Sequence, residues 1–595
     1  MMGLLQSAIE TFNRMEAEYA GVEYEGKETL APIAHIMAKP QVEITIDEQG
    51  NFSSARKCDA EKKIAIPVTE ESAARSRVAR AHALCDQIQY VTDIIKEKHE
   101  LYVKQLEDWC NSSYSHPKIK AVLLYAQKHD VINDLKQAGL LEFDKNGKIK
   151  NEKDLICWNV VGLGEKSGPV WCDLELMKQF ARYYASITES NSEKLCFLSG
   201  KKQKMAKFHI KGVVANSGNA KIISANDTEN FTYRGRFVTA EEALTVSYIS
   251  SQKAHNALKW IVANNGVSVG NRTFICWDPK GYSVPHIVNP LLVNDSAKSK
   301  PTEYRENLRK AIAGDARKLP QNESVIIAGF DAATAGRLSI TYYNELLGSD
   351  FFQRLLEWDE SCCWYDSFWG ASAPTLKSII TMTYGVQKHS NEKSTMELDT
   401  KIVGQHMQRL VHCRIDKALL PTDLMMRIVQ NASNMQTYTK ENRRKLLFTA
   451  CAVIKKYRYD HFKEEWNMAL KEYRKDRSYQ FGRLLAIMEK IEKDTYESDE
   501  EREANAIRMQ TVFVQRPGYA TKIILGQLKN AYYPKLPPGL RGYYDKMIGQ
   551  IMEIISAFDE EYNKSLSETY LLGYYLQKNA LYTKKEKDNN SEVEQ

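Results

Sequence analysis

Lysines and amide side chains gather in one stretch of the chain, and their types suit the binding of a polyanion. Lysine neutralises phosphate as a point charge, whereas asparagine and arginine can reach base edges in a groove. The competing interpretation is a basic surface loop that leads into a core helix. The candidates for nucleic-acid contact are Lys201, Lys202, Lys204, Lys207, Lys211, Asn216, Asn219, Asn226, Arg234 and Arg236.

The segment after these residues predicts a helix over 247–261. Its apolar stripe consists of Ala254, Ala257, Leu258 and Ile261. We therefore expect a mostly buried helix on which Gln252 and Lys253 are the exposed candidates for nucleic-acid contact. Alternatives stay open for the residues before the helix. The two arginines are two apart on a strand and share one face, which also suits a salt bridge, and the asparagines also suit turns.

Other residue types that carry chemistry do not assemble into a recognisable catalytic pattern. His129-Asp130 is a dipeptide used by metal-dependent phosphohydrolases, so a metal-dependent nuclease is the rival hypothesis, with a helix-capping role for Asp130 as its alternative. Gly162 and Gly164 have the wrong spacing for a dinucleotide loop, and no HExxH or GxSxG occurs. The eleven cysteines form no CxxC pair. We expect a binding protein without catalytic residues, cofactor or metal.

Composition places the chain among ordinary soluble proteins. Its 595 residues predict three or four domain-sized units. The formal net charge is +6, from 82 basic and 76 acidic residues, so any nucleic-acid binding must come from local patches. The sequence opens with an amphipathic segment rather than a secretory signal, and no apolar run reaches membrane-spanning length. We expect a reduced, cytoplasmic protein with free thiols.

The elements that must position these residues predict a multidomain α+β fold. Strand 42–46 turns into a return strand at Phe52, while 93–110, 118–138 and 174–186 read as helices. Strands follow at 272–277, 325–330 and 338–343. The polar residues 386–400 are expected to be a linker, and the chain after them is nearly all helical. The predicted parts are a mixed region (1–385), the linker, connecting helices (401–467) and a helical bundle (468–595).

Several longer stretches, in their order along the chain, resemble one protein family. They are CFLSGKKQKMAKFHIKG (196–212), IISANDTENFTYRGRF (222–237), SYISSQKAHNALKWIV (247–262), AGRLSITYYNEL (335–346), SYQFGRLLAIMEK (478–490), GYYDKMIGQIMEII (542–555) and LLGYYLQKNALY (571–582). By these stretches the sequence resembles the large subunit of the type I-C CRISPR effector complex, or Cascade, of the Csd1 type. The resemblance covers essentially the whole chain.

The resemblance implies a role without DNA cleavage. Such a subunit sits at the foot of a guide-RNA filament, recognises the protospacer-adjacent motif in duplex DNA, helps to open the duplex and stabilises the R-loop. It presents the complex to a separate helicase-nuclease, while the guide itself reads the target sequence. The implied partners are the guide-containing complex, the target duplex, the helicase-nuclease and a small helical subunit made from the same gene. A pure scaffold that touches only protein is a further alternative.

The C-terminal region carries the helical stripes of a bundle that could fold alone. We expect the small subunit to begin at Met468, because the codons of Lys463-Glu464-Glu465 must be purine-rich and could form a ribosome-binding tract. The alternative is that the glutamates form a solvated helix face and Met468 is an ordinary core residue. Candidates for binding a single strand near this start are Lys471, Arg474, Lys475 and Arg477.

Overall fold

The computed structural model describes residues 3–24, 26–75, 78–188, 193–224, 236–292, 299–334, 336–390, 393–497 and 502–582. Helices and strands are mixed, as expected for an α+β protein. The chain divides into two compact units, fewer than the three or four that its length predicted. The first unit comprises Met1–Ser268, Arg272–Ser283 and Ser324–Glu345. The second comprises Val269–Asn271, Val284–Glu323 and Leu346–Gln595.

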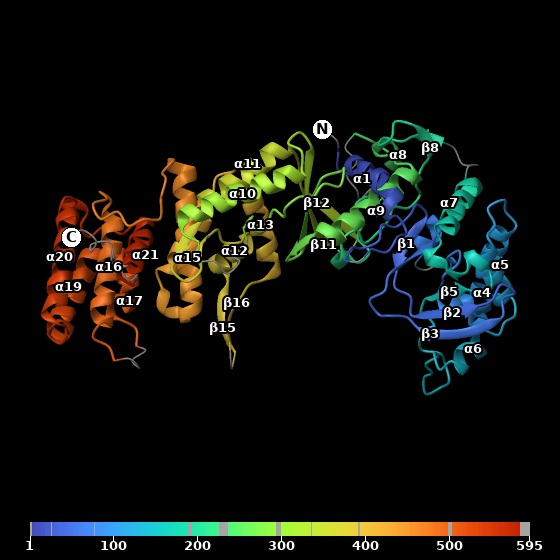
Figure 1. The fold of residues 1–595 in the computed structure, drawn as a ribbon, viewed down its shortest axis with the longest axis horizontal. Helices are drawn as coiled ribbons and strands as arrows, with labels where there is room; N and C mark the ends of the chain where they lie inside the picture. Colours follow the sequence, from blue (N-terminus) through green and yellow to red (C-terminus); the bar gives the residue numbers. More distant parts are fainter. Residues whose placement is uncertain are drawn as a thin grey trace, which may run out of the picture. The chain divides into compact units, whose positions relative to one another are not determined.

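The first unit holds most of the strands (Figure 1). In chain order its elements are α1 (Leu4–Tyr19), β1 (His35–Ala38), β2 (Val42–Ile46), β3 (Phe52–Lys57), β4 (Ile64–Pro67), α2 (Glu70–Ala73), α3 (Ile88–Val91), α4 (Lys96–Cys110), α5 (Pro117–Ala126), α6 (Val131–Gln137), β5 (Ile156–Val160), β6 (Gly168–Pro169), α7 (Leu174–Thr188), β7 (Glu193–Leu195), β8 (Lys202–Lys204), α8 (Ala240–Ala243), α9 (Tyr248–Asn265), β9 (Val267–Val269), β10 (Arg272–Trp277), β11 (Ser324–Thr334) and β12 (Arg337–Leu347).

The first sheet of this unit has the strand order β3-β2-β5-β6. Strands β2 and β3 form the predicted hairpin, and β5 pairs parallel to β2. Gly50 closes the hairpin with φ +68°, and a Cβ there would come within 2.7 Å of the Tyr125 amide nitrogen on α5. Ile44 and Trp158 are register partners on one face, where the Trp158 ring meets Tyr125 edge-on at 5.7 Å. Helix α5 therefore covers the apolar face of the sheet.

The second sheet has the order β12-β11-β10-β9 and carries the helix that follows the basic stretch. Helix α9 packs against both α1 and β10, and α1 and α9 lie side by side in Figure 1. Phe12, Leu258 and Trp277 belong to the shared core. The Trp277 indole N–H also donates to the Thr11 hydroxyl at 3.1 Å, so α1 is fixed to the sheet as well as to α9.

The second unit is mainly helical. Its elements are α10 (Pro301–Lys318), α11 (Gly348–Ser361), β13 (Trp364–Asp366), β14 (Gly370–Ser372), α12 (Leu376–Tyr384), β15 (Val386–Ser390), β16 (Lys393–Glu397), α13 (Thr400–Ile415), α14 (Thr422–Ala432), α15 (Lys440–Phe462), α16 (Arg477–Lys493), α17 (Asn505–Arg508), α18 (Gln510–Gln515), α19 (Pro517–Gln527), α20 (Pro538–Ser556) and α21 (Thr569–Tyr582).

Two glycines let α16 and α21 approach closely. A Cβ at Gly482 would lie 1.9 Å from the Tyr570 carbonyl oxygen, and one at Gly573 would lie 2.0 Å from the Tyr479 carbonyl oxygen. No side chain fits at either position, so the two backbones touch and their flanking side chains interlock. Both helices are buried along most of their length.

Two sequence expectations about the elements are wrong. Residues 386–400 are not an unpatterned linker, because β15 and β16 pair antiparallel and α13 begins at Thr400. The ribbon is polar on both faces, so its strands lack the apolar alternation that marks a half-buried strand. The helix expected over 118–138 is interrupted between α5 and α6, where His129 takes a left-handed φ of +59°.

Candidate nucleic-acid interface

The basic stretch begins with a short exposed hairpin. Strands β7 and β8 pair antiparallel, and the Cys196 amide donates to the Lys201 carbonyl at 2.9 Å. Gly200 makes this turn possible with φ +66°. Lys201 and Lys202 are both exposed at this end of the ribbon. Their ammonium groups are thus open to solvent.

The next two lysines interact with the protein itself. The Lys204 ammonium lies over the rings of Tyr184 at 5.5 Å and Tyr248 at 5.8 Å, and burial lowers the pKa of Lys204. Lys207 remains exposed and lies 4.0 Å from a carboxylate oxygen of Glu71. Among the first four lysines, Lys201 and Lys202 are therefore the stronger candidates for phosphate contact.

A second group of cations lies deeper, around Lys211. The pKa of both Lys221 and Lys259 is lowered, first by burial and then by the charge of Lys211. In the part of the chain that the structure describes, no carboxylate forms an ion pair with Lys221 or Lys259. Lys211 thus lies close enough to two partly buried lysines to lower their pKa, and the described residues supply no acid that compensates the charge of Lys221 or Lys259. Such an arrangement is costly by itself and becomes favourable when a polyanion supplies the missing charge.

Two neutral histidines lie next to these lysines. The His209 Nδ1 lies 2.8 Å from the Ser251 hydroxyl, and the His209 and His255 rings stack at 5.8 Å. Burial, helped by the charge of Lys221, lowers the pKa of His209 to about 3 and that of His255 to about 4. Both rings are therefore uncharged at neutral pH, and the positive charge of this region comes from the lysines.

The predicted asparagines and arginines are only partly described. Asn219 is exposed, and its side chain forms no hydrogen bond to the described part of the chain, so the turn-capping alternative finds no support there. Arg236 is exposed, with its guanidinium 5.2 Å from the Phe237 ring centre. Asn216 lies in a short 3-10 turn, Ala215–Ser217. Asn226 and Arg234 lie outside the described residues.

The expectation that Gln252 is exposed is wrong, since its exposed fraction is 5%. Lys253 is partly buried and donates to the Asn13 side chain of α1 at 2.6 Å. Helix α9 is covered by α1 on one side, and Asn256 holds the backbone at Ala31 on another. A single apolar stripe in the sequence does not reveal a helix that is covered on several sides.

The C-terminal candidates separate into arginines held by the fold and exposed lysines. Arg474 lies 3.7 Å from the Trp466 ring centre and pairs with Glu464, and Arg477 is buried and donates to two backbone carbonyls, including that of Ser565 at 2.8 Å. These arginines stabilise the fold, which corrects the view that all four candidates face a nucleic acid. Lys471 and Lys475 are exposed.

Met468 lies in the segment between α15 and α16, with φ +60° and a buried side chain. The helices after it do not pack only among themselves. Helix α15 packs on α21, and Arg458 of α15 pairs with Glu568 at 3.1 Å. A product that began at Met468 would form without this packing and this ion pair.

His129 and Asp130, the dipeptide behind the metal-dependent nuclease hypothesis, would need neighbouring metal ligands. The His129 Nδ1 lies 3.7 Å from the Asp93 carboxylate, and its ring centre lies 5.2 Å from that of His99. Asp130 is the N-cap residue of α6 and makes no side-chain cap hydrogen bond. Among the described residues, neither His129 nor Asp130 belongs to a three-ligand metal group.

Comparison with known proteins identifies the chain at the level of family. The profile of the CRISPR-associated protein (Cas_Csd1) family matches residues 15–582. The chain belongs to the Cas_Csd1 family. None of the curated proteins compared with this Cas_Csd1 chain matches it. Among the described residues, no helix combines the length and apolar character needed to cross a bilayer.

Sequence reasoning missed Lys221 and Lys259 of this Cas_Csd1 protein. Lys259 lies within the expected helix 247–261, but its proximity to Lys211 depends on how the segment before the helix folds back. Lys221 pairs with the start of β12, because its backbone carbonyl accepts from the Leu338 amide at 2.9 Å. The sequence offered only a weak signal for these two lysines. Each lies near the predicted basic stretch in the sequence but is separated from its last lysine by other residues.

Proposed function

We propose that this Cas_Csd1 protein is the non-catalytic large subunit of a type I-C RNA-guided surveillance complex. In this role it recognises the protospacer-adjacent motif in duplex DNA, helps to open the duplex and stabilises the R-loop in antiviral defence. Its partners are the guide-containing subunits, a small helical subunit from the same gene and the helicase-nuclease. Family membership supports the CRISPR setting, and the basic surface of the first unit supports the DNA contact.

The observation that carries the proposal is a group of lysines that form no ion pair with an acid among the described residues. The charge of Lys211 acts on both Lys221 and Lys259, which are partly buried, and Lys201 and Lys202 are exposed on the β7–β8 hairpin. Duplex DNA carries its charge on regularly spaced phosphates, and lysines that meet them release counterions. Asn219 and Arg236 are exposed and can hydrogen-bond to base edges. Backbone binding and motif reading thus have separate residues.

The test measures duplex binding by the assembled effector complex as a function of salt. The first variant is Lys201→Ala with Lys202→Ala, and the second is Lys211→Ala with Lys221→Ala. We expect weaker binding on every sequence and a shallower salt slope, by about 0.9 for each phosphate that the variant no longer neutralises. Replacing two exposed lysines on α5 and α6, Lys120 and Lys136, is the matched control for charge.

Motif reading has its own variants. Asn219→Ala and Arg236→Ala should reduce the preference for the correct adjacent motif while leaving the salt slope nearly unchanged. If the salt slope of duplex binding is unchanged in both double-lysine variants, this surface does not contact DNA and the scaffold alternative is favoured. Cleavage of DNA by the complex without the helicase-nuclease, abolished by His129→Ala with Asp130→Ala, would instead establish the enzymatic alternative.

A further inference from the structure

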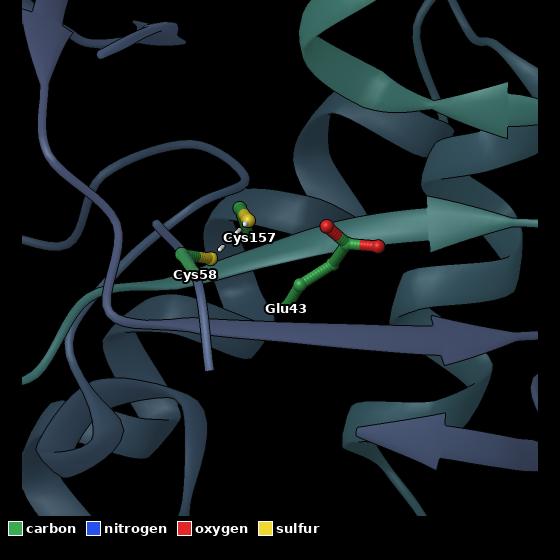
Figure 2. Close-up of side chains that lie close together, drawn as sticks. All are labelled: Glu43, Cys58 and Cys157. Atoms are coloured by element: carbon green, nitrogen blue, oxygen red, sulfur yellow. Dashed lines mark hydrogen bonds between the residues drawn. The ribbon is translucent and has the colours of Figure 1, made fainter. Parts of the chain in front are cut away.

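Three possible metal ligands gather on the first sheet, away from the basic surface. Glu43 lies on β2 and Cys157 on β5, and the two are register partners in the parallel pair. Cys58 directly follows β3, two residues beyond Arg56, which is the register partner of Glu43. Alternate residues of a strand share a face, so all four side chains lie on the face opposite Ile44 and Trp158. Figure 2 shows the two sulfur atoms facing each other with the Glu43 carboxylate beside them.

The spacing of these atoms matches a tetrahedral cation. The Cys58 and Cys157 sulfurs are 3.8 Å apart, and one carboxylate oxygen of Glu43 lies within 4.8 Å of both. Two thiolates bound tetrahedrally at about 2.3 Å from Zn²⁺ are themselves about 3.8 Å apart. A disulfide requires about 2.0 Å between the sulfurs. Binding a metal therefore requires less movement of the two sulfur atoms than forming a disulfide does.

Burial and charge agree with this spacing. The exposed fractions of Glu43 and Cys157 are 5% and 0%, while Cys58 is half-buried and leaves an approach from solvent. The Arg56 Nη2 donates to both Glu43 oxygens, at 2.9 and 3.0 Å, and 74% of the Arg56 side chain is exposed. Arg56 can therefore tilt outward and keep one oxygen while the other turns to a cation.

We propose that Glu43, Cys58 and Cys157 form a site for a thiophilic divalent cation, with Zn²⁺ as the fitting ion and water as the fourth ligand. Two thiolates and one carboxylate carry three negative charges, which the cation and the Arg56 guanidinium balance. Binding releases the two thiol protons to solvent, because only thiolates ligate the metal. The bound ion ties the end of β3 to β5 across β2 and so stabilises the first sheet.

The test uses the purified full-length chain, reduced and stripped of metal with a chelator. Co²⁺ is titrated first, because its thiolate complexes show a sulfur-to-cobalt charge-transfer band, and Zn²⁺ is then added to displace it. We expect one ion per chain, release of two protons for each ion, and a higher unfolding temperature with Zn²⁺. Cys58→Ser and Cys157→Ser should abolish the charge-transfer band, and Glu43→Gln should weaken binding.

Cys172→Ser is the matched control, because Cys172 is an exposed free thiol elsewhere in the same unit. It should leave the band and the stoichiometry unchanged. Cys58 is the decisive position, since its half-buried side chain tolerates serine better than the buried Cys157 does. A band that survives Cys58→Ser overturns the proposal, as does a chain that binds no Co²⁺. If the chain takes up no metal but forms a Cys58–Cys157 disulfide with hydrogen peroxide, the two cysteines are a redox pair and the cation site is refuted.

Discussion

Replacing Glu489 by glutamine removes a buried charge from the interface between α16 and α21. Glu489 is 2% exposed, and both its carboxylate oxygens accept from the Lys578 ammonium, at 2.9 and 3.0 Å. Lys493 donates to the same carboxylate at 2.6 Å, and the Tyr574 hydroxyl donates to it at 2.5 Å. Glutamine preserves the shape of the side chain but leaves Lys578, whose side chain is 31% exposed, without a counter-charge.

The magnitude follows from the pKa of Glu489. Burial alone would raise this pKa, but the charges of Lys578 and Lys493 with the hydrogen bonds outweigh burial and lower it from 4.5 to about 2. At about 1.4 kcal/mol per pKa unit, this lowering corresponds to roughly 3 kcal/mol. Burial also lowers the pKa of Lys578, which offsets part of this gain. We therefore expect Glu489→Gln to destabilise the helix pair by about 2–3 kcal/mol, slightly less than the loss of one partner from a fully buried pair.

The sign of the pH dependence follows from the same values. The pKa of Glu489 is lower in the folded state than in the unfolded chain, so its contribution is fully present above about pH 4.5. It is lost as the pH falls toward about 2. Glu489→Gln should remove this part of the acid sensitivity at α16 and α21.

Hydrogen exchange of the α16 and α21 amides measures the opening free energy of this region directly. Glu441→Gln is the control, because Glu441 pairs with Lys445 on the exposed side of α15. Protection should fall strongly in Glu489→Gln and stay unchanged in Glu441→Gln. If Glu489→Gln exchanges at the parent rate, with the same acid sensitivity, the carboxylate does not stabilise the helix pair.

Three further predictions concern packing, acid stability and translation. Gly482→Ala should lower the free energy of unfolding by about 1–3 kcal/mol, because its Cβ would overlap the Tyr570 carbonyl. The control is Gly549→Ala on α20, whose Cβ meets no atom and which should be neutral or stabilising. Thermal melts compare the two variants. Acidification from pH 6.5 toward about 4 should destabilise the first unit, because its buried histidines have depressed pKa values and stay neutral in the folded state while the unfolded chain takes up protons. Thermal melts over a pH series measure this, and a melting temperature that does not change with pH would contradict it. These histidines are His35, His82, His209 and His255. Recoding the codons of residues 463–465 and replacing Met468 by leucine should remove a short C-terminal product from intact-mass spectra, and a short product with another N-terminus would exclude Met468 as the start.

The sequence predicted those elements whose signals are local. The β2–β3 hairpin, α4, α7 and α9 follow from alternation, helical period and turn residues within a few positions. The β15–β16 ribbon was missed because its strands are polar on both faces and bury little. Such a ribbon is held by pairing and by neighbours, including the Gln387 side chain, which accepts from the Asn442 amide at 2.8 Å.

The candidate sites depend on contacts that a single sequence does not show. The exposed lysines of the β8 hairpin were predicted from the basic run, but the approach of Lys221 and Lys259 to Lys211 requires the tertiary fold. Gln252 was placed wrongly because α9 is covered on more than one side. Cys58 and Cys157 meet only because β2 brings β3 and β5 into one sheet, and their separation along the chain resembles no metal-binding spacing.

A structure of the assembled effector complex on target duplex DNA tests the central claim most directly. The account predicts phosphates within hydrogen-bond reach of Lys201 and Lys202 and of the group formed by Lys211, Lys221 and Lys259. It also predicts that Asn219 or Arg236 faces a base edge of the adjacent motif. Duplex DNA bound elsewhere on the complex, with this lysine surface open to solvent or covered by another protein subunit, would contradict it.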